Sequence, residues 1–241
     1  MRNPLRFLPL AFWMTAACAL AGPGELVMLA PVDQSMPLAR FQNGVISGGI
    51  VKDVSEALAQ RMNRRVVFLN ADTPDVTPFL TSGRADGMCY VMPFWIDGDY
   101  NWTLPFLPDS EMIAARSDAP HLRSLKDLKD KPVGTVVGYR YPRVHQVLGN
   151  RFRRVDAANM DKNIEQMVAG KVPYTVISEA TLVYQQRLHP GLKVRADLVF
   201  SAYKAQCAFS KQSAVPFEEV SKAVDALIKD GSIDRILARY R

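Results

Sequence analysis

The sequence predicts an α/β protein with two similar lobes, each a mostly parallel sheet flanked by helices. Three observations lead to this prediction. Short apolar runs alternate with helical patterns, which is typical of parallel sheets covered by helices. The order helix, glycine plus basic residue, strand occurs twice, at Gly83-Arg84 and at Gly170-Lys171. The last segment, residues 216–240, is helical and lies outside the repeat, so it is expected to close the fold.

The first half of the chain supplies the clearest strand and helix patterns. Residues 26–30 (LVMLA) form a short apolar run bounded by Gly and Pro, as a buried strand does. Residues 50–62 carry apolar side chains at every fourth position, which places them on one face of a helix. Gly83 is a suitable residue to end a second helix. The expected strands are 26–30, 65–69, 85–91 and 111–116, and the expected helices are 50–62 and 74–81.

The same pattern restarts at residue 132, after a charged stretch (LKDLKDK). Pro142 suits the first turn of a helix, and Asn159 or Asp161 suits the start of the next. The expected strands are 132–137, 152–156 and 172–178, and the expected helices are 142–148, 159–169 and 179–187.

The C-terminal part is predicted to contain an extended segment at 199–209 and two helices at 216–229 and 233–240, which Gly231 separates. Ligands of open α/β sheets bind beyond the carboxyl ends of the strands. The candidate ligand loops are therefore 31–48, 90–104, 138–142 and 178–181.

The N-terminus has the pattern of a secretory signal peptide. Arg2 and Arg6 precede an uncharged run at 7–20, and Ala19-Leu20-Ala21 forms a small-residue cleavage site. The alternative is a membrane anchor, but the run is shorter than the about 20 residues that span a bilayer. Lipid attachment at Cys18 is a minor alternative. We expect residues 1–21 to be removed, which leaves a periplasmic protein that does not span the membrane.

Composition and motifs exclude several functions. Lys plus Arg number 30 and Asp plus Glu 24, a net charge of +6, so no dense basic surface for nucleic acid is expected. The chain has no phosphate-binding loop, dinucleotide fingerprint, nucleophile elbow, zinc-protease motif or C-x-x-C pair. The three histidines are far apart, so we expect no metal and no cofactor. Cys89 and Cys207 can form a disulfide in an oxidising compartment or remain two buried thiols, and both alternatives stay open.

Four segments in order carry a family resemblance: 41–62 (FQNGVISGGIVKDVSEALAQRM), 78–88 (PFLTSGRADGM), 124–138 (SLKDLKDKPVGTVVG) and 225–240 (DALIKDGSIDRILARY). They resemble the family 3 extracellular solute-binding proteins, the periplasmic receptors of polar amino-acid ABC transporters. The resemblance implies the two-lobed periplasmic-binding-protein-like fold of type II, with a hinge between the lobes. We expect lobe 1 to comprise residues 22–117 and 198–241, and lobe 2 residues 118–197.

The sequence departs from the family in the ligand site. Typical members have an arginine after the strand matching 85–91, which holds the ligand's carboxylate, but the loop here reads MPFWID. Where the family has an acidic residue in the opening segment, this chain has Val51. The acid that pairs with the ligand's amine in lobe 2 maps onto Glu179. The resemblance therefore implies an amino-acid site that is only half present.

Arg140 offers a substitute for the missing arginine. It lies where a strand ends and a helix begins, and a guanidinium there can grip a carboxylate with two hydrogen bonds. Aromatic residues on the expected loops can form the walls of a small-ligand pocket, although they can equally seal the lobe cores. The candidate ligand-binding residues are Arg140, Tyr139, Glu179, Trp95, Phe94 and Tyr90.

These observations predict a monomeric periplasmic protein, not an enzyme, that captures a small anionic or zwitterionic solute such as an amino acid or a small carboxylate. Capture is expected to occur by hinge closure, and the resemblance implies delivery to an inner-membrane ABC permease. One alternative is a ligand-binding sensor or accessory protein without transport. Another is a periplasmic dehydratase-like enzyme in which Glu179 is the buried acid.

Overall fold

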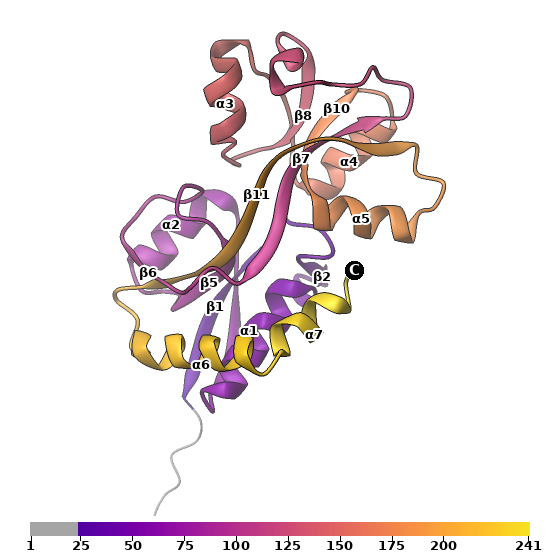
Figure 1. The fold of residues 1–241 in the computed structure, drawn as a ribbon. Helices are drawn as coiled ribbons and strands as arrows, with labels where there is room; N and C mark the ends of the chain where they lie inside the picture. The colour runs from indigo at the N-terminus through magenta and orange to yellow at the C-terminus, as the bar shows by residue number, and fades with distance from the viewer. Residues whose placement is uncertain (1–23) are drawn as a thin grey trace, which may run out of the picture.

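Two long strands, β7 (Leu107–Arg116) and β11 (Val194–Ser210), connect two α/β bodies in the computed structural model, which describes residues 24–241 (Figure 1). The signal peptide predicted at residues 1–21 lies outside the described residues. Within residues 24–241, no helix combines the length and the apolar character needed to cross a membrane.

Lobe 1, the body at the bottom of Figure 1, is built around a parallel pair of strands. In this pair, β1 (Glu25–Pro31) and β4 (Arg65–Ala71) run side by side along their whole lengths. The other strands that contribute are β5 (Gly87–Val91) and β6 (Tyr100–Trp102), with a small hairpin of β2 (Arg40–Gln42) and β3 (Val45–Gly48). Its helices are α1 (Ile50–Arg61), α2 (Thr73–Thr81), α6 (Phe217–Lys229) and α7 (Ser232–Ala238).

Lobe 2, the upper body, repeats the arrangement with its own parallel strands. Strand β8 (Pro132–Val136) lies between β9 (Arg153–Ala157) and β10 (Tyr174–Ser178), parallel to both. Its helices are α3 (Pro142–Leu148), α4 (Met160–Val168) and α5 (Glu179–Leu188), with short 3-10 turns at Leu125–Leu128 and Gly149–Arg151. The Asn159 side chain accepts a hydrogen bond from the Lys162 amide, so α4 begins where the sequence predicts.

The crossing strands make both lobes part of one nine-stranded sheet, in the order β4-β1-β5-β11-β7-β10-β8-β9 with β6 beside β11. Strands β7 and β11 pair antiparallel from Arg116 opposite Val194 to Leu107 opposite Ala205. Pairing is thus parallel in the outer part of each lobe and antiparallel at the crossing. The predicted two-lobed α/β fold is confirmed.

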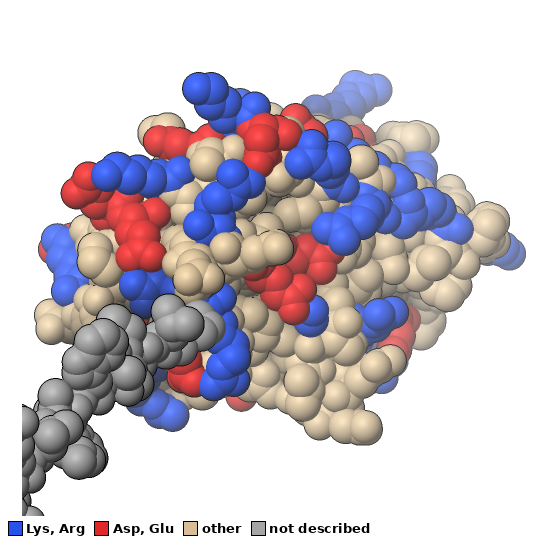
Figure 2. Space-filling view, turned by 90° about the horizontal axis from the view of Figure 1, so that it is seen from below, with Lys and Arg blue, Asp and Glu red and all other residues tan. Residues whose placement is uncertain are grey.

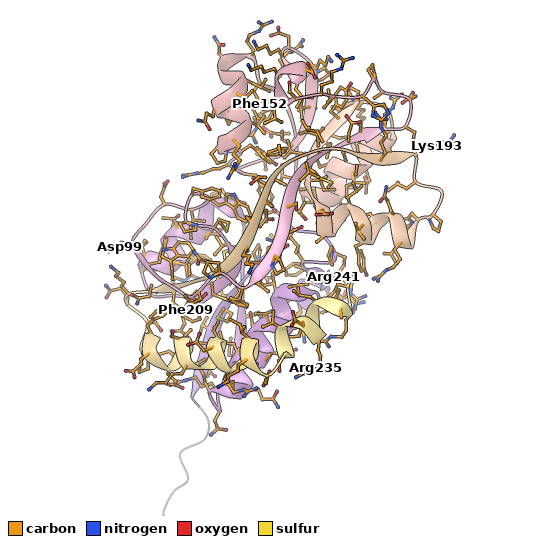
Figure 3. All side chains as sticks on the ribbon, viewed as in Figure 1. Asp99, Phe152, Lys193, Phe209, Arg235 and Arg241 are labelled. Carbon is orange, nitrogen blue, oxygen red and sulfur yellow. A yellow bond between two sulfur atoms is a disulfide. The ribbon has the colours of Figure 1, made fainter. Side chains whose placement is uncertain are left out.

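Each lobe has its own apolar core. Phe209 belongs to the core formed by β1, α1, α6 and α7, and Phe152 to the core beneath α3, and Figure 3 labels both. Charged side chains on the outer face of lobe 1 are paired, as Arg64 is with Glu219 (3.0 Å) and Arg239 with Asp53 (3.1 Å). Figure 2 shows this side, where acidic and basic side chains lie beside one another.

Cys89 and Cys207 form a disulfide, which decides between the two alternatives left open by the sequence. The two residues face each other on the antiparallel strands β5 and β11. The bond therefore fixes the lobe 1 end of the crossing strand to the centre of the lobe 1 sheet.

Removing this disulfide is expected to destabilise the protein. The bond closes a loop with a sequence separation of 118 residues. Loss of a disulfide with a long loop typically costs about 2–4 kcal/mol. We therefore expect the double variant C89A/C207A to melt roughly 5–15 °C below the wild type. The measurement is thermal unfolding, with reductant added to the wild type as a second route to the same state. Equal melting temperatures would show that strand pairing alone holds β5 to β11.

Candidate functional site

A cavity of about 140 Å³ lies between the lobes and is lined by residues of both. One water molecule needs only about 10–15 Å³, so the cavity can hold a small organic solute. The lining comes from the loops after β1, β5, β8 and β10, from the starts of α2 and α4, and from the crossing strands. The four loops predicted from the sequence therefore meet at one place.

Tyr90 enters the cavity because the β5–β11 ladder is irregular. Cys207 pairs with Cys89 and Gln206 pairs with Val91, which leaves Tyr90 as an extra residue on its strand. Its backbone has a φ of 65°, in the left-handed region that a bulky residue rarely adopts. Such bulges re-aim a side chain and are common next to binding sites.

The Asp109 carboxylate is saturated with hydrogen bonds. It accepts from the amides of Ser110 (2.8 Å) and Ala180 (3.0 Å), and from the hydroxyls of Tyr203 (3.3 Å) and Tyr90. Burial is the main cause that raises the pKa of the Tyr90 hydroxyl, and the Asp109 charge adds to it. Because Ala180 lies in α5 and Tyr90 in β5, Asp109 joins the two lobes at the crossing.

Glu111 lies two residues further along β7 and has a different environment. Its side chain lines the cavity and only 8% of the residue is exposed. No hydrogen bond from any residue in 24–241 reaches its carboxylate. Burial raises its pKa, an effect that Arg143 opposes and Asp109 reinforces. Glu111 is therefore a largely buried residue whose carboxylate faces the cavity and accepts no hydrogen bond from residues 24–241.

Asp33 joins the lobes on the other side of the cavity. Its carboxylate accepts hydrogen bonds from Thr73 of lobe 1 and from the Tyr139 hydroxyl of lobe 2 (3.3 Å), and its carbonyl accepts from the Met160 amide (3.0 Å). Burial raises the pKa of Asp33. Gly138 faces Thr73 with a φ of 78°, and a Cβ atom there would lie 3.1 Å from the Thr73 side chain. The positive φ and this close approach of the lobes together favour glycine at position 138.

Arg140 lies at the rim of the cavity and is ion-paired across the lobes. Its guanidinium donates two hydrogen bonds to Asp97, one of them 2.7 Å long. Both side chains are exposed, at 48% and 71%. The Arg140 guanidinium lowers the pKa of the Asp97 carboxyl. The pair therefore connects lobe 2 to the lobe 1 loop after β5 beside the cavity, which Arg140 lines.

The structure brings four of the six sequence-predicted residues together in the cavity lining, namely Tyr90, Trp95, Tyr139 and Arg140. The other two do not line the cavity. Phe94 is 43% exposed on the loop after β5. Glu179 is exposed at the first position of α5, whereas Ser178 and Thr181 beside it line the cavity.

Sequence reasoning missed several lining residues: Asp33, Gln34, Glu111 and Tyr203. One signal for Glu111 was present, because the residue opens an otherwise apolar run (EMIAAR) predicted as a buried strand. Within the described part of the chain, no cluster of three or more His, Cys, Asp or Glu residues could hold a metal ion.

Comparisons with known proteins agree with this architecture. No protein-family model matches the chain. A relative described as a probable amino-acid-binding protein, YxeM of Bacillus subtilis, is 25% identical over 224 residues, which cover 86% of this chain and 80% of YxeM.

Solved structures match over nearly the whole chain. An ancestral arginine-binding protein bound to arginine superposes with a TM-score of 0.77 at 22% identity, covering 91% of this chain and 99% of that one. The ancestral amino-acid-binding protein AncCDT-1, described as a precursor of cyclohexadienyl dehydratase, gives a TM-score of 0.73 at 18% identity, covering 90% and 95%. The predicted resemblance to solute-binding proteins of amino-acid transporters is confirmed.

The contrast between Glu111 and Asp109 gives a prediction for the ligand-free protein. Glu111→Gln is expected to raise stability at neutral pH by about 0.5–2 kcal/mol, because it removes a buried charge. The folded protein holds the Glu111 proton at higher pH than the unfolded chain, whose pKa is near 4.5. The free energy of unfolding of the wild type therefore decreases as pH rises above that value, and the variant, which has no carboxyl group at this position, does not show this decrease. Thermal unfolding should show a small difference near about pH 4 that grows toward about pH 7.

Asp109→Asn is the matched control on the same strand. The new amide group faces hydroxyl donors that need an acceptor, so this variant is expected to lose about 1–3 kcal/mol. Destabilisation by both substitutions at neutral pH would contradict the conclusion that only Asp109 is satisfied within the protein.

Proposed function

We propose that this chain is a solute-binding protein that captures a small zwitterionic or anionic solute, an amino acid or a small carboxylate, by closing two lobes around it. The observation that carries the proposal is the cavity lined from both lobes. Its fold is that of amino-acid-binding proteins, and its cavity lies beyond the carboxyl ends of strands, where ligands of such sheets bind.

The contacts between the lobes support capture by hinge closure. Asp33 joins Tyr139 and Met160, and Arg140 joins Asp97, so both connections break when the lobes separate. A ligand that touches both lobes stabilises the closed state by its higher affinity for that state. Bending is expected in β7 and β11, the strands that connect the bodies, with the lobes divided as the sequence predicts: 22–117 with 198–241, and 118–197.

Tyr90, Trp95 and Tyr139 are the proposed walls of the ligand site, and Arg140 its carboxylate-binding group. A guanidinium has five N–H donors, and Asp97 occupies two of those on Arg140. The remaining donors are available to a ligand carboxylate at the rim. Phe94 and Glu179 receive no support from the geometry as ligand contacts.

The proposed location is the periplasm, reached with the signal peptide predicted at residues 1–21. The disulfide between Cys89 and Cys207 supports an oxidising compartment. The resemblance of the sequence to the receptors of amino-acid ABC transporters supports delivery of the ligand to an inner-membrane ABC permease. A sensor or accessory protein would use the same cavity without that partner. A dehydratase-like reaction would need its acid in the cavity, and Glu179 lies outside the lining.

Ligand binding is tested by thermal unfolding of ligand-free protein against amino acids, small carboxylates and aromatic acids. A ligand at 100 times its dissociation constant adds about 2.7 kcal/mol of stability. In a chain of this size, the melting temperature should rise by roughly 5–10 °C. Small-angle scattering should show a smaller radius of gyration with the same ligand. Absence of any shift across the panel would contradict the proposed function.

Arg140→Ala is expected to weaken binding of a carboxylate-bearing ligand at least tenfold, or about 1.4 kcal/mol. Asp97→Asn is the control, because it removes the ion pair and leaves the guanidinium in place. Calorimetric titration should show a smaller loss for Asp97→Asn than for Arg140→Ala. Equal losses would mean that Arg140 acts only by joining the lobes.

A further inference from the structure

Two hydrogen-bond acceptors in the cavity lack a partner among the described residues. The Glu111 carboxylate receives no hydrogen bond although the residue is 92% buried, and the Gln34 Oε1 atom is also buried without a partner. Both residues line the same cavity of about 140 Å³. Buried acceptors in native proteins are nearly always paired, so the Gln34 oxygen lacks a donor. The Glu111 carboxylate faces the same cavity and is free to accept one.

The neighbouring hydroxyl groups do not supply that donor. Tyr90 and Tyr203 both donate to Asp109. On the opposite wall, the Thr73 and Tyr139 hydroxyls both donate to Asp33. These four hydroxyl groups thus donate to two other carboxylates. Tyr141 also lines the cavity, where its hydroxyl accepts a hydrogen bond from the Val136 amide (2.9 Å), and none of the lining hydroxyl groups donates to Glu111.

The nearby cations do not supply it either. Arg140 is the one basic residue of the lining, and its guanidinium is held on Asp97 at the exposed rim. Arg143 influences Glu111 electrostatically, but it lies exposed on α3 and makes no ion pair with it within the described residues. A charged carboxylate in this position is costly unless a positive group pairs with it.

We propose that Glu111 receives a cationic group of the ligand, an ammonium or a guanidinium, at the inner end of the cavity. This inference rests on the proposed function and narrows its ligand class: a solute with a positive group is accepted, and a purely anionic one is excluded. An ammonium has three N–H donors and a guanidinium five, so either has enough donors for both the Glu111 carboxylate and the Gln34 amide oxygen.

The aromatic lining favours the same group. Trp95 and Tyr203 pack edge to face, with ring centroids 5.3 Å apart, and both line the cavity with Tyr90. Aromatic faces attract cations, and the attraction is larger where water is excluded. A zwitterionic ligand would then lie with its cation toward Glu111 and its carboxylate toward Arg140, the basic residue of the lining.

The test compares probes that differ only in charge. Calorimetric titration at neutral pH uses L-phenylalanine, phenethylamine (cation only) and 3-phenylpropionate (anion only), together with L-arginine and agmatine. At least one cation-bearing probe should bind, and 3-phenylpropionate should not. Glu111→Gln should weaken the binding of that cation-bearing probe at least tenfold. Glu165→Gln, which neutralises an exposed acid on α4, is the matched control and should bind as the wild type does.

The outcomes distinguish a failure of the inference about Glu111 from a failure of the proposed solute-binding function. Binding of 3-phenylpropionate as tightly as L-phenylalanine, or unchanged binding of a cation-bearing probe by Glu111→Gln, would overturn the inference and leave the proposed function intact. If none of the five probes and no solute of the wider panel binds, both fail. The melting temperature of Glu111→Gln, at or above that of the wild type, verifies that a loss of binding is not a loss of folding.

Discussion

The antiparallel pairing of β7 with β11 holds the two lobes in one continuous sheet. These strands are the only segments of the described chain that belong to both lobes, and their ladder continues the lobe 1 sheet into the lobe 2 sheet. The ladder shifts register between Ala196 and Leu198 and again between Val199 and Ser201. Bulges of this kind bend a strand locally. The irregularity therefore lies next to Glu111, a residue of the cavity lining that is opposite Ser201.

Strand β7 presents two carboxylates with opposite roles. Asp109 holds Tyr90, Tyr203 and the start of α5 in place, and its four hydrogen bonds leave little capacity for a ligand. Glu111 has no such bonds. A fold that satisfies one acid fully and leaves its neighbour unpaired gives up stability at the second position. Such a loss is typical of a position kept for binding rather than for folding.

The sequence was sufficient for most of the architecture, because each lobe repeats short apolar strands and amphipathic helices. It failed where polar residues interrupt the pattern. Strand β7 begins at Leu107 instead of residue 111, since Pro108 and Asp109 break the apolar run. The short strands β2, β3 and β6 were missed as well. Arg140 lines the cavity, but its pairing with Asp97, 43 positions away, is a tertiary contact that no local pattern encodes. The role proposed for Glu111 also depends on tertiary contacts, because the hydroxyl groups of Tyr90 and Tyr203 donate to Asp109.

The disulfide has a consequence for the order in which the chain can assemble. Lobe 2 is continuous in sequence between the two crossing strands, whereas lobe 1 needs β1 to β5 together with the far end of β11 and the helices α6 and α7. A protein chain is synthesised from its N-terminus, and its N-terminal parts generally fold first. Lobe 2 is therefore complete before Cys207 and the last helices are available. Lobe 1 can therefore complete its fold only after lobe 2. The disulfide between Cys89 and Cys207 can form only when the two separate segments of lobe 1 have paired.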